Sequence, residues 1–176
     1  MLSLVSPAVV ACAYRSAVGR LGPASKGTLF IGIPHVGRLD EPALSPQLRR
    51  ALARRLVVRN AHLVARRDAA DIRLETRVLS LQRELPAIVG RRTASEDLVL
   101  RLEAWLTGAS GKTLWRSGLV VARVQSAVPA VPAAAEDTRR KATRVLADRA
   151  AAAVVSRLSR PKPVSSQRRW SRSTLP

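Results

Sequence analysis

Few residues in this chain of 176 are of the types that carry out catalysis or hold metals. It has one cysteine, Cys12, and two histidines, His35 and His62. The histidines form no His-x-x-x-His pair and have no cysteine at metal-ligand spacing, so we expect no metal site and no cofactor. No Gly-x-Ser-x-Gly nucleophile motif is present. A Ser-His-Asp arrangement assembled from distant residues stays open, but the sequence favours a binding protein over an enzyme.

The segment from Gly108 to Thr113, Gly-Ala-Ser-Gly-Lys-Thr, looks like the end of a phosphate-binding P-loop. A P-loop needs a further glycine five positions before Gly111, where this chain has Leu106. It must also open a helix, whereas an alternating, strand-like segment follows here. We therefore interpret Gly108–Gly111 as the turn of a β-hairpin.

Cys12 ends an apolar run that begins at Met1 and contains no charged side chain. Val9-Val10-Ala11-Cys12 has the form of a lipobox, in which the thiol accepts a diacylglycerol and small neighbours fit the signal peptidase. The run is short and lacks a basic start, which indicates a truncated signal peptide over residues 1–11. We expect Cys12 to be lipidated, with palmitate-type acylation. The alternative is a buried segment that happens to contain a cysteine.

The chain is strongly basic, with 31 Lys and Arg against 12 Asp and Glu and a formal net charge of +19. All but four of these cations are arginines, which pair with phosphate and carboxylate through a planar fork. Such a surface attracts nucleic acid, anionic lipid or phosphorylated glycolipid, unless the arginines only reflect genomic base bias. Aromatic residues make up only 3% of the chain, so paired stacking platforms for bases are lacking and no nucleic acid is expected.

Hydrophobic periodicity predicts two helices and four strands. One helix begins with Ser45 as its N-cap and Pro46 at its first position, and it ends near Asn60. The other runs from about Glu136 to Leu158, with Val145 among the residues of its apolar stripe. The strands are expected at 28–33, 72–81 (with a phase slip at Leu79), 98–106 and 114–124, with a long basic loop at 83–95.

These elements predict a single α+β domain in the order β-α-β-β-β-α, with two helices packed on one face of a small mixed sheet. The domain is expected over residues 28–158. Residues 12–27 are expected to be a tether, and residues 159–176 a disordered basic tail.

Five segments in this order resemble the lipopolysaccharide-assembly lipoprotein family LptE, over Cys12 to about Leu158. They are Cys12-Ala13-Tyr14-Arg15, the strand Phe30-Ile31-Gly32-Ile33-Pro34, the helix Leu48-Arg49-Arg50-Ala51-Leu52, the phrase Ala69-Ala70-Asp71-Ile72-Arg73-Leu74, and Glu136, Arg139, Ala142, Leu146 and Ala150. The resemblance implies a lipid-anchored protein on the periplasmic side of the outer membrane of a Gram-negative cell. It would sit inside or under the LptD β-barrel and assist lipopolysaccharide insertion.

Two sets of candidate site residues follow. Arg83, Arg91, Arg92 and Lys112 are expected to bind anionic lipopolysaccharide, with a solvated basic loop as the alternative. A sheet face without an assigned cover is expected to contact the barrel. That face is expected to carry Val99, Trp105, Trp115, Leu119 and Val121 among the polar residues Asp97, Arg101 and Glu103. Its alternative covers are a loop, the basic tail or a second copy.

Two other functions remain open at this point. One is a periplasmic lipoprotein of the curli-secretion or cell-wall-synthase-activator type, which would share Cys12 but need no glycolipid affinity. The other is a cytosolic RNA-binding protein in which Met1 is the true start.

Overall fold

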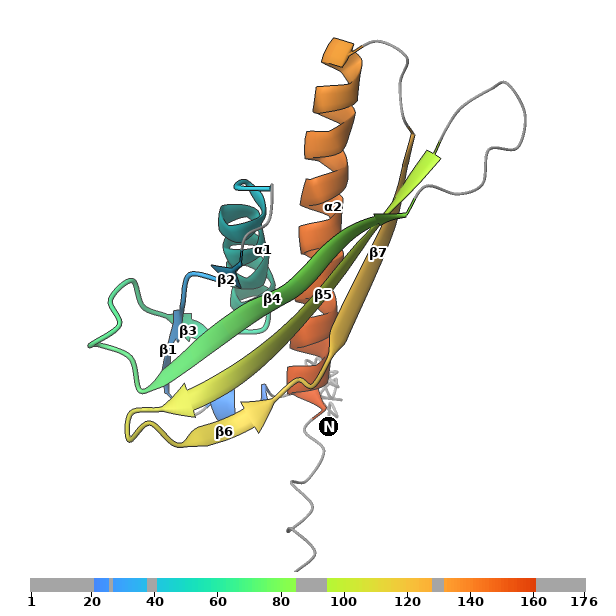
Figure 1. Cartoon of the computed structure of the whole chain (residues 1–176). Helices are drawn as coiled ribbons and strands as arrows, with labels where there is room; N and C mark the ends of the chain where they lie inside the picture. Colours follow the sequence, from blue (N-terminus) through green and yellow to red (C-terminus); the bar gives the residue numbers. More distant parts are fainter. Residues whose placement is uncertain (1–20, 26, 38–40, 85–94, 128–131, 161–176) are drawn as a thin grey trace, which may run out of the picture.

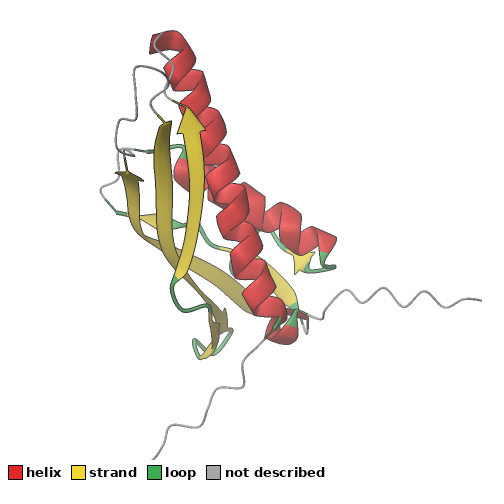
Figure 2. Ribbon diagram, turned by 90° about the vertical axis from the view of Figure 1, so that its right-hand side faces the viewer, coloured by secondary structure: helices red, strands yellow, loops and turns green. Residues whose placement is uncertain are grey.

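The computed structural model describes residues 21–25, 27–37, 41–84, 95–127 and 132–160. Within them lie two helices and a mixed sheet of seven strands, and both helices cover the same face of the sheet (Figures 1 and 2). The elements are η1 Gly22–Ser25, β1 Thr28–Ile31, β2 His35–Val36, α1 Leu44–Val58, β3 His62–Leu63, β4 Ile72–Glu84, β5 Ser95–Gly108, β6 Thr113–Arg116, β7 Val120–Ala127 and α2 Pro132–Ser159. The predicted α+β class is confirmed.

A long antiparallel hairpin of β4 and β5 forms the centre of the sheet. On one side of it, β1 and then β2 pair with β4 in parallel, and β3 pairs with β1 in parallel. On the other side, β7 and β6 pair one after the other with β5, both antiparallel. The predicted third meander strand, 114–124, is therefore two strands. Gly118 separates them with a φ of 62°, a left-handed conformation that interrupts extended backbone.

The phase slip predicted at Leu79 is confirmed as a β-bulge, because the register of β4 against β5 shifts between Val78 and Ser80. Before the bulge, Ile72, Leu74, Thr76 and Val78 face the helices and are buried; after it, Leu81 takes the inward position opposite Leu100. The bulge thus exchanges the two faces for the rest of the strand. One consequence is that Arg83, two residues beyond Leu81, points toward the helical side.

Both helices differ in detail from their predicted boundaries. Ser45 is not the N-cap of α1: the cap is Ala43, and the Ser45 hydroxyl instead donates to the Pro34 carbonyl at 3.1 Å. The predicted stop is confirmed, since Asn60 has a φ of 60° just after the C-cap Arg59. Helix α2 begins four residues earlier than predicted, at Pro132.

The predicted apolar stripe of α2 is wrong in one residue, Val145, which is 44% exposed. The helix packs against α1 on one side and against β5 and β7 on another, so its buried surface is wider than a single stripe. Ala147, Ala151 and Val155 extend this surface and are buried.

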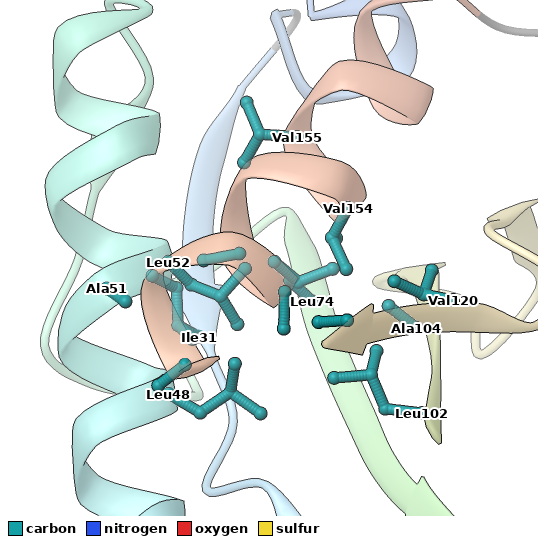
Figure 3. Close-up of a cluster of buried hydrophobic side chains, with 14 of the residues drawn as sticks. Ile31, Leu48, Ala51, Leu52, Leu74, Leu102, Ala104, Val120, Val154 and Val155 are labelled. Carbon is teal, nitrogen blue, oxygen red and sulfur yellow. The ribbon is translucent and has the colours of Figure 1, made fainter. Parts of the chain in front are cut away.

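The core is built mainly of leucine and alanine between the helices and the inner sheet face. Figure 3 shows Leu48 and Leu52 of α1 meeting Leu74 of β4 and Val154 of α2. The expected tether does not extend to residue 27, because Leu21 and Ala24, beside and in η1, are 1% exposed and belong to this core. An apolar pair at this spacing can bury itself even in a segment rich in glycine and proline. Residues 12–20 lie outside the described residues.

Candidate functional site

The sheet surface turned away from α1 and α2, here called the outer face, is not covered by any described element (Figure 2). By the observed register it consists of Arg73, Glu75, Arg77, Gln82 and Glu84 of β4, Asp97, Val99, Arg101, Glu103 and Trp105 of β5, and Val121, Arg123 and Gln125 of β7. These strands expose alternate residues because successive side chains point to opposite faces of a strand. The outer face is therefore a candidate surface for a partner.

Opposite charges on the outer face lie next to one another. Arg123 bonds Glu84 at 3.3 Å, Arg77 stands opposite Glu103, and Arg101 donates to Gln82. The four arginines and the four carboxylates of the outer face thus largely compensate each other across strands. The outer face is therefore mixed in charge rather than basic.

Trp105 is held in place on this face. Its indole Nε1 donates to Glu75 Oε2 at 3.0 Å, and Arg67 lies 3.8 Å from the other oxygen of the same carboxylate. The ring is half-buried and stands opposite Arg116 of β6. A fixed aromatic residue with a paired polar tip is typical of an interface residue.

Three of the five residues expected on this face are buried or lie outside the strands that form it. Trp115 stands opposite Leu106 and belongs to the inner core, because the bulge between Leu106 and Thr107 changes the register. Val99 does point outward but is 1% exposed; its neighbours across the sheet, Gln82 and Arg123, have longer side chains. Val121 is on the face and 50% exposed, and Leu119 is exposed in the turn before β7.

The residues expected to bind lipopolysaccharide do not form one site. Arg83 stands opposite Leu98 near the start of β5, whereas Lys112 is exposed in the turn after Gly108 at its end. Ten strand residues separate these positions, which is roughly 33 Å. Arg91 and Arg92 lie outside the described residues, as does Cys12.

Arg83 has a partner that the sequence did not suggest. Glu41, whose side chain is only 10% exposed, lies between two arginines: Arg139 of α2 at 2.8 Å and Arg83 of β4 at 3.7 Å. Arg139 places both Nε and Nη2 on Glu41 Oε2, and this hydrogen bonding raises the pKa of Arg139. The cluster ties the segment before α1 to α2 and the sheet. Because 98 residues separate Glu41 from Arg139, no sequence pattern signals the pair.

A second ionic cluster joins the two helices. Arg54 and Arg55 of α1 contact the two carboxylate oxygens of Asp148 in α2, at 2.9 and 3.3 Å. The hydrogen bond from Arg54 is the main reason why the pKa of Asp148 is lowered. Helix α1 itself carries arginines and no acidic residue, so the basic charge of the described residues gathers on the helical layer.

The Ala69-Ala70-Asp71 segment also has a structural role. Asp71 Oδ2 accepts from the backbone and the hydroxyl of Thr28, both at 2.8 Å, which lowers the pKa of Asp71. The Asp71 amide in turn donates to the Thr28 hydroxyl at 3.1 Å. This reciprocal contact sets the register in which β1 and β4 start side by side.

The described residues contain no group of three or more His, Cys, Asp or Glu that could hold a metal ion. Both His35 and His62 are exposed in short strands. The Gly108–Thr113 segment joins β5 to β6 through Gly111, whose φ is 80°, which confirms the hairpin interpretation. In the part of the chain that the structure describes, no helix has the length and apolar character needed to cross a membrane.

Several solved structures that share this fold are lipoproteins or putative lipoproteins of bacteria. A putative lipoprotein from Caulobacter crescentus matches with a TM-score of 0.54 and 17% identity, over 75% of this chain and 88% of that one. The rare lipoprotein B from Shewanella oneidensis matches with a TM-score of 0.51 and 18% identity, over 76% and 94%. A minor lipoprotein from Acinetobacter baumannii matches with a TM-score of 0.50 and 14% identity, over 76% and 92%. At such identities these structures show the fold alone.

The sequence itself identifies the family. No curated protein sequence matches this chain. A family model described as "LptE: Lipopolysaccharide-assembly" matches residues 27–158, which are well over half of the chain and include α1, all seven described strands and all but the last residue of α2. The chain therefore belongs to the LptE lipopolysaccharide-assembly family.

Proposed function

We propose that this protein is an outer-membrane lipoprotein that assists lipopolysaccharide assembly as the plug of an LptD-type β-barrel. Family membership supports the role in lipopolysaccharide assembly, a non-catalytic one. It also favours this role over curli secretion, cell-wall-synthase activation or RNA binding. The observation that carries the barrel partnership is the uncovered outer face with its mixed charges.

The chemistry of the outer face fits a barrel interior better than it fits lipid. The lumen of an outer-membrane barrel is polar, whereas its lipid-facing band is apolar. The outer face offers paired charges, the fixed Trp105 and the exposed Val121, and most of the large apolar residues of both helices are buried in the core. A surface of this kind can enter a polar lumen without stranding charges in hydrocarbon.

In-cell photocrosslinking tests this partnership. Crosslinkers at Trp105 and Val121 should trap a much larger membrane protein, while one at Arg140, on the exposed side of α2, should trap it far less. If the outer-face positions trap only lipid or a second copy while the barrel protein is present, the plug proposal is refuted.

The proposed anchor is an acylated Cys12 on the periplasmic face of the outer membrane. Intact-mass analysis of membrane fractions should show the loss of residues 1–11 and the addition of acyl mass. Cys12→Ser should release a folded protein from the membrane, since the acyl chains on Cys12 are proposed to supply most of its affinity for the membrane. A mature protein that retains Met1 would contradict the proposal.

We further propose that Arg91 and Arg92 contact the phosphates of lipopolysaccharide, with Lys112 as a separate contact. Arg83 is the weakest of the four candidates because it lies beside Glu41. Replacing Arg91 and Arg92 together by alanine should weaken lipopolysaccharide binding, most visibly at low salt. Unchanged binding by the folded double variant would remove Arg91 and Arg92 from the proposal.

A further inference from the structure

A pocket is lined by residues of α1, of β1 and the segment after it, and of β3 and the residue after it. Figure 1 shows where these elements lie in the fold. Its volume is about 460 Å³, within the range of small-molecule sites. Most of its lining is apolar and comes from Ile31, Ile33, Ala53, Leu63 and Val64. None of the residues that line this pocket belongs to the outer face.

The pocket is open because β3 is short. The backbone ladder between β1 and β3 ends where Val64 donates to the Leu29 carbonyl at 3.0 Å. Beyond that point the edge of β1 has no neighbouring strand, and Ile33 is left 71% exposed. Helix α1 turns its leucines to the core, so Pro46, Arg50 and Ala53, at helical spacing, line the opposite wall. An exposed isoleucine beside a concave apolar surface is a feature that folding does not require.

The polar part of the pocket carries only positive charge. Arg49 and Arg50 line it, and none of the lining residues is acidic. Arg49 is fixed: its Nε donates to the Ile31 carbonyl at 3.2 Å, and its guanidinium lies 5.8 Å from the centre of the Phe30 ring. Arg50 is exposed. The first turn of α1, which contributes Ser45 and Pro46 to the lining, has no acidic residue to oppose the positive end of the helix dipole.

We propose that this pocket binds the alkyl chain of a phosphate-bearing amphiphile. The chain lies against Ile33, Ala53 and Leu63, and the phosphate pairs with Arg50 and with the outward nitrogens of Arg49. An added peptide strand fits less well. Such a strand would need the Ile31 carbonyl as an acceptor, and Arg49 already donates to it. This inference rests on the proposed function in lipid handling and names the part of a lipid that the pocket takes.

Calorimetric titration of the full chain with hexyl, octyl and decyl phosphate, each below its micelle concentration, tests the proposal. Each added methylene that becomes buried should tighten binding by up to about fourfold, until the pocket is filled. Octanol, octyltrimethylammonium and inorganic phosphate should each bind at least tenfold more weakly than octyl phosphate. Equal binding of octanol, or equal binding by all three chain lengths, would overturn the proposal.

Three variants locate the binding. Arg50→Ala should weaken the binding of octyl phosphate by about tenfold, as expected for the loss of a charge-assisted hydrogen bond. Ile33→Ser should weaken this binding severalfold without disturbing the fold, because Ile33 is exposed. Ala53→Phe should fill the pocket and abolish binding. Arg140→Ala, on the exposed side of α2, is the matched control and should bind as the wild type does.

If Arg50→Ala and Ile33→Ser both bind like the control, the pocket is not the site and the proposal is wrong. It is also wrong if an acidic peptide competes with octyl phosphate and binds more tightly. These titrations use the purified chain, whereas the barrel partnership is tested by crosslinking in cells. A negative titration with positive crosslinking therefore removes the pocket and leaves the proposed function standing.

Discussion

The contact between Glu41 and Arg139 allows a sharp test of how this fold is held together. Arg139→Ala removes two hydrogen bonds, of 3.0 and 2.8 Å, from a carboxylate whose side chain is 10% exposed. Breaking a fully buried ion pair costs about 3–5 kcal/mol, because the remaining charge stays dehydrated. Here Arg139 is 32% exposed and Arg83 remains 3.7 Å from Glu41. We therefore expect a loss of about 2–3 kcal/mol in the free energy of unfolding.

Arg140→Ala is the matched control on the next residue of the same helix. Arg140 bonds Glu136 at 3.0 Å, but its side chain is 70% exposed, so the loss should be about 0.5 kcal/mol or less. Both substitutions gain the same helix propensity from alanine. For a domain of this size, about 2–4 °C per kcal/mol puts the Arg139 variant roughly 4–12 °C below the wild type in Tm.

Urea denaturation of the two single variants, of Glu41→Gln and of the Glu41→Gln/Arg139→Ala double variant measures this directly. The cycle isolates the Glu41 contact from anything else that Arg139 touches, and it should give a coupling of about 1.5–3 kcal/mol. If Arg139→Ala lowers the free energy of unfolding no more than Arg140→Ala does, or if the coupling energy is near zero, then Arg139 does not stabilise the buried Glu41 carboxylate. Either result would refute this expectation.

Three other perturbations should give defined results. Thr76→Val should raise the free energy of unfolding by about 1 kcal/mol in urea titrations, because the Thr76 hydroxyl is buried without a hydrogen-bond partner; a less stable variant would contradict this. The pKa of Asp148 is lowered by Arg54, so its stabilising effect is present above the ordinary value of 3.8 and is lost as the pH falls below it. Asp148→Asn should therefore lower the free energy of unfolding more at pH 6 than at pH 2. Equal losses of stability at the two pH values would contradict a stabilising role of ionised Asp148. Gly27→Ala should lower the Tm, since a Cβ there would lie 2.7 Å from Asp71 Oδ2, while Gly37→Ala has open space and should not; equal Tm values would refute the contact.

The sequence determined the class of fold and most of its elements. Alternation along residues 72–81 predicted β4 together with a phase slip at Leu79, which the register shows to be a bulge, because a two-residue period and its interruption are local properties of the chain. Helical spacing by itself predicts that Leu48, Ala51, Leu52 and Leu56 share one side of a helix, and in α1 each of them is buried. The order of such local signals also indicated the family, which the match over residues 27–158 confirms.

What the sequence could not show depends on contacts between distant residues. Trp115 alternates with its neighbours as an outer-face residue would, yet a register shift places it in the core. Val145 fits a helical stripe, but α2 is buried from two directions and leaves Val145 outside the buried surface. A single stripe can be deduced from spacing, whereas the direction from which partners approach cannot.

The candidate sites show the same division. Composition indicated a basic protein, but only the tertiary structure shows that the charges on the outer face compensate each other and that the helical layer carries the excess. Glu41 has no local feature that marks it as buried, and its burial becomes tolerable only when α2 brings Arg139 to it. The pocket beside Ile33 exists because β3 ends before β1 is covered. Local periodicity fixes which residues form an element, but pairing, register and the ends of strands are decided by the free energy of the whole packed domain.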